Sequence, residues 1–459
     1  MESYFGDLTL TRLLFQRGLA AVYLIAFISA LNQFRPLLGE KGLLPVPQFL
    51  KYVSFKQTPS LFHWHYSDRF FGIVAWVAIG LSLLALSGLS ERGSIWLSML
   101  IWFILWVIYL SIVNVGQTFY SFGWESMLLE AGFFCIFLGS HAIPTPLVPM
   151  LCLRWMLFRT ELGAGLIKIR HDACWRKLTC LFYHYETQPL PNPLSWFFHQ
   201  LPKQMHKFSV FFSHVVQLII PFGLFAPQPI AGIAGIFIIF HQLWLIISGN
   251  YSWLNWLTVI LGITALSDSL LSFIPFTPAT STVSSGLFEM LMYILAVVTV
   301  GLSVQPVRNL FSRNQLMNYN YNPLHLVSTY GAFGSVTQKR YEIILEGTLD
   351  TMITPQTTWD TYEFKGKPGN PKRRPPQVAP YHLRLDWLMW FLPFGVTVTN
   401  SGTIFAQHEL WFLRLVKKLL ENDQSIIRLL RSSPFPPENF SIIVMRIFLS
   451  IWSNPNAST

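Results

Sequence analysis

The chain has 459 residues, of which 52% are hydrophobic, 16% aromatic and only 12% charged, with a formal net charge of +10. Soluble globular proteins carry about 25% charged residues, and a soluble core of this size could not bury so much apolar surface. The composition therefore excludes a soluble protein and indicates an integral membrane protein. Excess positive charge fits nucleic acid or anionic lipid, but these basic residues mostly border apolar stretches. We therefore expect the lipid bilayer as a partner, and no nucleic acid.

About nine apolar stretches are long enough to cross a bilayer, for which about 20 residues are needed. We expect no cleavable signal sequence, because Glu2 and Asp7 precede a first apolar run that is long enough to remain as an anchor. Pro144, Pro146 and Pro149 interrupt the apolar sequence between the fourth and fifth stretches. The predicted spans lie near residues 13–31, 70–89, 94–113, 125–143, 147–168, 208–226, 230–248, 253–275 and 287–304.

Two long polar segments, 32–69 and 169–207, separate some of these spans and are rich in aromatic residues, Pro and His. Such a composition is typical of segments at the membrane interface, where aromatic rings lie at headgroup depth. With nine spans, both segments and the C-terminal part fall on the same side of the membrane. The excess of Lys and Arg would place that side in the cytoplasm, although this rule weakens for long loops and whole domains.

Charge becomes much denser after residue 305. Residues 1–305 hold 16 Lys and Arg with 12 Asp and Glu, and residues 306–459 hold 16 and 10. We therefore predict a multi-span transmembrane domain over 1–305 and a water-facing domain over 306–459. The expected fold class is a polytopic α-helical membrane protein with about nine spanning helices and a C-terminal α+β domain that contains a small antiparallel sheet.

The alternation of apolar and polar residues predicts the strands of that sheet. In residues 340–349, Tyr341, Ile343 and Leu345 are expected on one face, with Glu342 and Glu346 on the other. Residues 359–367 alternate in the same way, and residues 410–420 are typical of an amphipathic helix.

Residues that could carry chemistry are few. The chain contains no glycine-rich phosphate loop, no GxSxG motif and no HExxH motif. His63 and His65 form an HxH pair with only Asp68 nearby as a further ligand, so we interpret them as interfacial histidines. We expect no metal site and no cofactor.

Ionisable residues gather in and just after the fifth apolar span. At membrane depth such residues are costly and are usually paired or functional. Glu161 and Lys168 are seven residues apart, which places them on one face of a helix. We interpret the group as an ion network that holds helices together, with Lys168 paired to Glu161 or to another carboxylate such as Glu130; the alternative is that Lys168 is a base or a ligand anchor. The group comprises Arg159, Glu161, Lys168, Arg170 and Asp172.

Cys174 and Cys180 lie close together in the second polar segment. A loop of this length can close a disulfide, but only in an oxidising compartment. Two reduced thiols fit the spacing equally well, and a zinc site would lack two ligands. Cys135 and Cys152 lie inside apolar runs, where we expect buried thiols.

Long runs of the chain resemble the lipase maturation factor family. Residues 163–193 read GAGLIKIRHDACWRKLTCLFYHYETQPLPNP and are similar to the signature loop of that family, and SGNYSWLNWLT resembles a later membrane segment. Residues 322–348 and 362–391 are similar to its C-terminal domain. The signature positions present here are Gly163, Gly165, Trp175, His184, Tyr185, Glu186, Pro189 and Asn192.

The resemblance implies a membrane-bound maturation factor that helps secreted or exported proteins, lipases in this family, to fold and assemble. It implies the endoplasmic reticulum membrane in a eukaryote, with the long loop and the C-terminal domain in the lumen. A bacterial member would lie in the inner membrane, and no lipase client could then be assumed. The implied orientation opposes the one from the Lys and Arg count and favours a disulfide between Cys174 and Cys180.

A shorter run, AGLIKIRHDACW, is similar to a segment of the vitamin K-dependent gamma-carboxylase, in which the lysine that matches Lys168 is the catalytic base. This resemblance covers only residues 164–175. It keeps open an alternative function, a membrane-embedded enzyme that uses Lys168 as a base on a lipid-soluble cofactor or substrate. Our preferred interpretation is a non-enzymatic factor whose clients are exported proteins.

Overall fold

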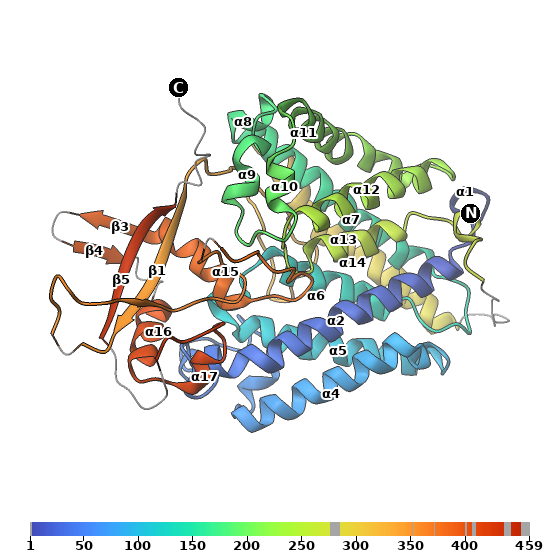
Figure 1. The fold of residues 1–459 in the computed structure, drawn as a ribbon. Helices are drawn as coiled ribbons and strands as arrows, with labels where there is room; N and C mark the ends of the chain where they lie inside the picture. The colour runs from blue at the N-terminus through green and yellow to red at the C-terminus, as the bar shows by residue number, and fades with distance from the viewer. Residues whose placement is uncertain are drawn as a thin grey trace.

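The computed structural model describes residues 2–275, 285–350, 352–370, 372–399, 402–405, 410–435 and 442–450. Its largest part is a bundle of long helices, and the C-terminal strands lie together at one end of that bundle (Figure 1). The predicted combination of a polytopic helical part with antiparallel strands is confirmed. Residues 451–459 of the predicted C-terminal domain lie outside the described residues.

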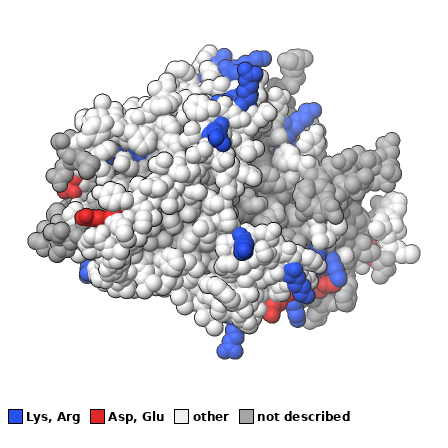
Figure 2. Space-filling view, turned by 180° about the vertical axis from the view of Figure 1, so that it is seen from behind, with Lys and Arg blue, Asp and Glu red and all other residues white. Residues whose placement is uncertain are grey.

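Six helical segments in the described part of the chain are long and apolar enough to cross a membrane. Their outward faces carry exposed large apolar side chains, such as Trp76, Phe208 and Val297, which suit contact with lipid. Seen from behind, most of the surface is uncharged (Figure 2). The six segments are α2 (Thr9–Leu38), α4 (Asp68–Ser87), α5 (Ile95–Val115), α11 (Lys203–Leu218) with η4 (Ile220–Phe225), α12 (Ile230–Ser248) and α14 (Gly286–Phe311).

The other three predicted spans form helices outside this group, so nine spanning helices are not confirmed. The helix α6 (Gly123–Ile136) ends early, because Gly139 turns the chain in a left-handed conformation (φ 69°) and prolines follow. The helix α13 (Leu254–Ile263) has only 10 residues, half of the roughly 20 that a span needs. The helix α7 (Leu147–Arg170) has 24 residues, but it carries several charged side chains along its length: Arg154, Arg159, Glu161, Lys168 and Arg170.

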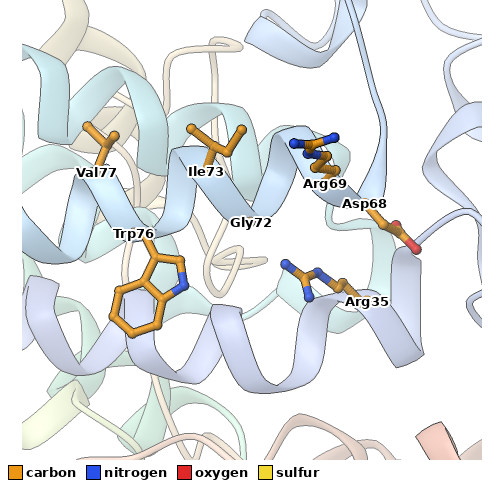
Figure 3. Close-up of a pocket in the computed structure, with 7 residues that line it drawn as sticks. All are labelled: Arg35, Asp68, Arg69, Gly72, Ile73, Trp76 and Val77. Atoms are coloured by element: carbon orange, nitrogen blue, oxygen red, sulfur yellow. The ribbon is translucent and has the colours of Figure 1, made fainter.

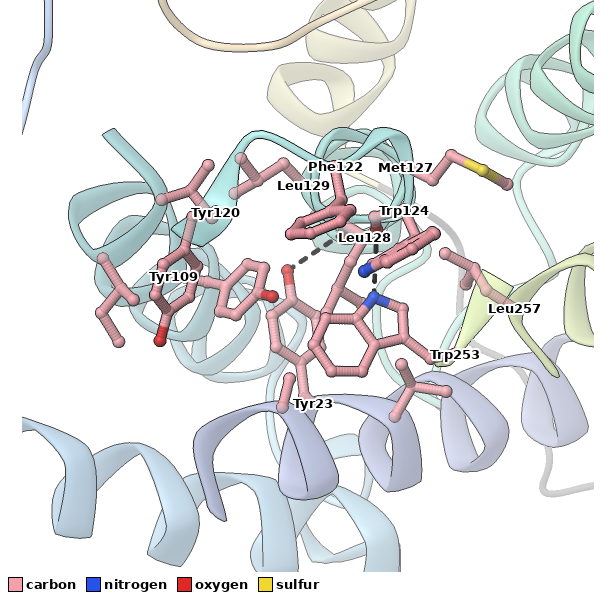
Figure 4. Close-up of a cluster of buried hydrophobic side chains, with 14 of the residues drawn as sticks. Tyr23, Tyr109, Tyr120, Phe122, Trp124, Met127, Leu128, Leu129, Trp253 and Leu257 are labelled. Carbon is pink, nitrogen blue, oxygen red and sulfur yellow. Dashed lines mark hydrogen bonds between the residues drawn. The ribbon is translucent and has the colours of Figure 1, made fainter. Parts of the chain in front are cut away.

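Aromatic side chains fill the core where α2, α5, α6 and α13 meet (Figure 4). The rings of Tyr23 and Tyr109 meet edge to face with centroids 5.7 Å apart, a favourable geometry for aromatic pairs. The indole Nε1 of Trp253 donates to the backbone oxygen of Trp124 at 3.1 Å. An added Cβ at Gly132 would clash with the Tyr23 hydroxyl, so this glycine lets α2 and α6 approach closely.

The two predicted interfacial segments contain mainly short helices. In the first, Nε2 of His63 lies 2.9 Å from the backbone oxygen of Thr58, and His65 packs edge-on against Phe70. The short elements of these segments are α3 (Val46–Phe49), η1 (Leu61–His63), α8 (Ala173–Arg176), α9 (Leu181–Thr187) and α10 (Ser195–His199). Elsewhere in the helical part lie α1 (Glu2–Phe5), η2 (Leu89–Glu91), η3 (Gln117–Tyr120) and η5 (Asp268–Leu271).

The described residues of the C-terminal part form two small antiparallel sheets. In the first, β1 (Arg340–Thr348) lies between β2 (Asp360–Thr361) and β5 (Ile442–Ser450), and Ile343 is in register with Ile447. The second pairs β3 (Val396–Thr399) with β4 (Gly402–Phe405). The helices of this part are α15 (Arg384–Phe391), η6 (Leu392–Gly395), α16 (Leu410–Leu420), which coincides with the predicted amphipathic helix, and α17 (Gln424–Ile427).

Two details of the predicted strands are wrong. Only residues 360–361 of the expected second strand are paired as a strand. In β1, Ile343 and Leu345 are buried as predicted, but Tyr341 is 49% exposed and Glu342 only 5% exposed. Glu342 is buried because its carboxylate pairs with Arg340 and Lys367, a tertiary contact that alternation along one strand does not reveal.

Both interfacial segments contact the C-terminal part. Arg414 of α16 donates to the backbone oxygen of Leu43 at 2.8 Å. Arg340 of β1 donates to the backbone oxygen of Pro189 at 3.1 Å. The three regions therefore lie at the same end of the bundle, and their sharing one side of the membrane stays a prediction.

Candidate functional site

Arg159 of α7 and Glu130 of α6 form a buried ion pair between the two helices, with side chains that are 1% and 0% exposed. Arg159 also donates to the backbone oxygen of Ser328. Glu130 accepts from the backbone N–H of Ser328 at 3.0 Å and from the hydroxyl of Tyr330 at 2.7 Å. A buried pair is tolerated when further hydrogen bonds satisfy its polar atoms. This pair also holds the segment around Ser328 against the helices.

Lys168, near the end of α7, is 6% exposed and has two contacts that fix its ammonium group. Its Nζ donates to Oε1 of Gln217 in α11 at 2.8 Å and lies 4.8 Å from the ring centroid of Trp175. Glu161 instead accepts from Nε2 of Gln242 in α12 at 2.7 Å. Lys168 and Glu161 were predicted to pair with each other, but each is hydrogen-bonded to a glutamine of another helix.

The predicted ion network is therefore divided among separate partners in the part of the chain that the structure describes. Lys168 is not in a salt bridge with Glu161 or Glu130. Glu130 is paired with Arg159, and Glu161 accepts from Gln242. Arg170 donates to Oε1 of Gln315 and to the backbone oxygen of Leu310, each at 2.7 Å. Asp172, the remaining member, caps α8 by accepting from the backbone N–H of Cys174 at 2.9 Å.

A cavity of about 350 Å³ lies beside Lys168, between α9, α11 and α12. We call it the Lys168 cavity. Lys168 is the only charged residue among the described residues that line it, and most of the others are aromatic or aliphatic. Its lining includes Lys168, Trp175, His184, Phe212, His241 and Trp244. Small-molecule sites commonly combine an apolar lining with a few polar groups in this way.

His184 of α9 closes one side of the cavity. Its Nε2 lies 3.0 Å from the hydroxyl of Tyr251, which donates to Oε1 of Gln188 at 2.7 Å. Burial, together with the positive charge of Lys168, lowers the pKa of His184 to about 4. The imidazole is therefore neutral near pH 7, and Lys168 remains the one cation of the lining.

Cys174 and Cys180 are joined by a disulfide in the structure, with Cα atoms 4.8 Å apart. Both are buried beside Trp175 and Val210, so the bridge braces the loop that carries Trp175 to the cavity. Three donor groups, from Asp172 and the two cysteines, lie within 4.8 Å of one another. With both sulfurs in the disulfide, no thiolate remains there to hold a metal.

We predict that this disulfide forms in the mature protein. Trypsin cleaves after Arg176 and Lys177, which are exposed between the two cysteines, so a non-reduced digest should contain two peptides joined through sulfur. Replacing both cysteines with serine should lower the free energy of unfolding by about 2 kcal/mol. Two separately alkylated peptides from protein isolated without reductant would contradict the prediction.

The predictions from sequence missed a second buried ionic centre, which joins the C-terminal part to α6. Arg384 of α15 donates to Oε1 of Glu125 at 2.7 Å and to the backbone oxygen of Phe119 at 2.8 Å, and its guanidinium lies 3.4 Å from the ring centroid of Tyr120. Both charged side chains are 0% exposed. Glu125 begins a predicted span and Arg384 lies inside one of the family-like runs, and neither pattern indicates that the two side chains meet.

His382 lies against the same carboxylate, with Nδ1 3.4 Å from Oε1 of Glu125. Burial and the charge of Arg384 lower the pKa of His382 to about 4, so this histidine is neutral near pH 7. Its Nδ1 accepts from the indole of Trp124 at 3.4 Å. Arg384 is therefore the cation that balances Glu125 among the described residues.

Models of two protein families match the chain. The lipase maturation factor transmembrane domain matches residues 10–273, and the lipase maturation factor C-terminal domain matches residues 326–458. Lipase maturation factor 1 of Mus musculus is 40% identical over 94% of this chain and 80% of its own length, and that of Homo sapiens is 40% identical over 94% and 81%. The chain belongs to the lipase maturation factor family.

A more distant member, lipase maturation factor 2 of Homo sapiens, is 30% identical over 92% of this chain and 76% of its own length. No solved structure matches the chain. Membership in a family with a transmembrane domain and the six long apolar helices make this an integral membrane protein.

The two glycines among the predicted signature positions allow close packing around α7. An added Cβ at Gly163 would clash with the backbone oxygen of Tyr330, and one at Gly165 would lie 2.8 Å from Leu218 of α11. The first clash involves backbone and cannot be relieved by a rotamer change. These two positions bring the C-terminal part and α11 onto the helix that carries Lys168.

The other signature residues connect the loop to its surroundings. Trp175 donates to the backbone oxygen of Phe333 at 2.8 Å, and Asn192 Nδ2 donates to the backbone oxygen of Ile247 at 2.9 Å. Glu186 lies 3.0 Å from Nε2 of His199. Tyr185 is buried against the aromatic lining of the Lys168 cavity, so the signature loop and the cavity form one region.

A second recess, of about 570 Å³, lies between α2 and α4 (Figure 3). Arg35, Asp68 and Arg69 lie at its polar end, and Trp76, which is 63% exposed, lies along its apolar side. Its lining comes from the outer faces of two membrane helices. This recess is a surface feature that lipid can cover, and the Lys168 cavity is the better candidate site.

Proposed function

We propose that this chain is a membrane-resident maturation factor that assists the folding and assembly of lipases. The observation that carries the proposal is its 40% identity, over 94% of its length, to lipase maturation factor 1 of three mammals. The chain covers 80–82% of those relatives, and both family models match within it. The role proposed is chaperone-like, and the clients are lipases passing through the secretory pathway.

The arrangement at one end of the bundle supports this proposal. The buried centres at Arg384 and Arg159 fasten the C-terminal part to α6 and α7. Beside it, α10 presents Trp196 and Phe197, which are 58% and 56% exposed. Exposed apolar side chains of this kind suit transient contact with a client chain that has not finished folding.

A contact experiment tests the proposal. A photo-crosslinking amino acid at Trp196, in the full chain expressed with a secreted lipase, should capture the lipase precursor. The matched control is the same amino acid at Leu89, which is 53% exposed at the far end of α4 and α5. Capture at neither position, or equally at both, would contradict the proposal.

We also propose an organisation into a transmembrane domain, 1–305, and a C-terminal domain, 306–459. The last membrane helix, α14, extends past this boundary to Phe311. We place the chain in the endoplasmic reticulum membrane with residues 169–207 and 306–459 in the lumen, an arrangement that requires the segment of α13 to cross the membrane together with α11, α12 and α14. Support comes from the family and from the contacts between these regions, such as Arg340 with the backbone oxygen of Pro189.

This topology gives a testable prediction. Asn370→Cys lies in an exposed loop of the C-terminal part, and its thiol should react with a membrane-impermeant reagent only after the lumenal side is opened. Cys135 and Cys152 are buried and serve as the internal background. Labelling of position 370 from the cytoplasmic side of intact membranes would contradict the topology.

An alternative function is favoured by one observation: among the described residues, Lys168 is buried beside a cavity and forms no salt bridge with a carboxylate. In that case the lysine would act as a base on a lipid-soluble substrate or cofactor. For the maturation factor we expect Lys168→Arg and Lys168→Met to lower lipase maturation only in proportion to the amount of folded protein. Arginine keeps the charge but cannot be deprotonated. Normal abundance with abolished function in Lys168→Arg would therefore favour the enzyme.

A further inference from the structure

The Lys168 cavity opens between two membrane helices. Its exposed lining residues are Met205 and Phe208 of α11 and Phe240 of α12, at 45%, 63% and 56% exposure. These side chains lie on helices whose outer faces suit contact with lipid. A hydrophobic molecule dissolved in the bilayer could therefore enter from the side without crossing water.

The opposite part of the lining is polar and buried. Lys168 is held by Gln217 and by the ring of Trp175, with little exposure to water. His241 of α12, 3% exposed, also lines the cavity, and its Nδ1 has no hydrogen-bond partner among the described residues. An ammonium group that forms no salt bridge among the described residues and an unpartnered ring nitrogen both favour an incoming polar group.

Volume and charge limit what that molecule can be. About 350 Å³ is near the lower end of the roughly 300–1,000 Å³ of small-molecule sites, which suits one acyl chain better than a two-chain phospholipid. One cation in an otherwise uncharged lining matches a headgroup with a single negative charge. Glu161 lies nearby but is bonded to Gln242 and does not line the cavity.

We propose that the Lys168 cavity binds a long-chain fatty acid, with its carboxylate on the ammonium group of Lys168 and its acyl chain between the aromatic side chains of α11 and α12. The acyl chain enters past Phe208 and Phe240. The carboxylate of the fatty acid can approach Lys168 without breaking a salt bridge of the protein. This site is independent of the proposed contact with lipases, since no lipase takes part in it.

The test uses the full chain in mild detergent and a palmitic acid analogue with a diazirine on its acyl chain. Labelling should map to peptides of α11 or α12, and unlabelled palmitic acid should compete about ten-fold better than 1-hexadecanol, which has the same chain without the charge. Equal competition by hexadecanol on the unmodified protein would overturn the proposal.

Variants locate the site. Ser209→Trp fills the cavity from α11, where Ser209 is part of the lining, and should abolish labelling. Phe211→Trp, on an exposed position of the same helix outside the lining, should leave it unchanged. Lys168→Met should weaken binding about ten-fold. The matched control is Lys207→Met, which removes an exposed lysine and should leave binding unchanged. Undiminished labelling of Ser209→Trp would overturn the proposal even if Lys168→Met failed to fold.

Discussion

Replacing Arg384 with methionine is expected to lower the free energy of unfolding by about 3–5 kcal/mol, the usual effect of removing one partner of a buried ion pair. The carboxylate of Glu125 would remain 0% exposed without its guanidinium, and the backbone oxygen of Phe119 would lose its donor. Because α15 belongs to the C-terminal part and α6 to the bundle, the two should also separate more readily. Thermal unfolding in detergent and limited proteolysis measure both effects.

The control for this variant is Arg92→Met, which removes an exposed arginine at the opposite end of the bundle. A surface substitution of this kind should change the free energy of unfolding by no more than about 0.5 kcal/mol. If Arg384→Met had the same melting temperature as the unmodified protein, the ion pair between Arg384 and Glu125 would not hold the C-terminal part in place.

The pair Glu130 and Arg159 should show strong coupling in a double-mutant cycle. Each single change, Glu130→Gln or Arg159→Met, leaves a buried charge without its partner and should lower the free energy of unfolding by about 3–5 kcal/mol. The double variant removes both charges, so it should lose less than the two single losses combined. Ser328 would lose contacts in every variant, because it bonds to both side chains.

An exposed ion pair provides the matched cycle. Nζ of Lys417 in α16 lies 3.7 Å from Oε1 of Glu421, the residue that follows this helix, and the side chains are 73% and 56% exposed. Lys417→Met and Glu421→Gln should couple by no more than about 0.5 kcal/mol, since exposed pairs contribute little. Equal coupling energies in the two cycles would contradict the claim that burial strengthens the interaction between Glu130 and Arg159.

Features that depend on a local pattern could be predicted from the sequence. The long apolar runs predicted helices such as α4, α5 and α12, and alternation along residues 340–349 predicted β1. The predicted length of α6 was too great, because the helix ends before the turn at Gly139, which lies inside an otherwise apolar run. α7 was predicted as a span from its length, and its charges show that protein rather than lipid surrounds much of it.

The candidate site depends on contacts between distant parts of the chain. We predicted a carboxylate partner for Lys168, but the ammonium group donates to Gln217, which lies 49 residues further along, in another helix. Arg384 and Glu125 are 259 residues apart. No spacing or periodicity in one sequence indicates which buried charge faces which, so these pairs could be found only in the folded structure.

The claim that this chain acts as a lipase maturation factor is tested most directly in cells that lack their own. The quantity to measure is the activity of the secreted lipase per lipase molecule. Expression of the unmodified chain should restore active lipase in the medium, and Arg384→Met should restore less, in proportion to the folded protein that remains. If the unmodified chain accumulated in the membrane and the lipase stayed inactive, the chain would not be a lipase maturation factor in function.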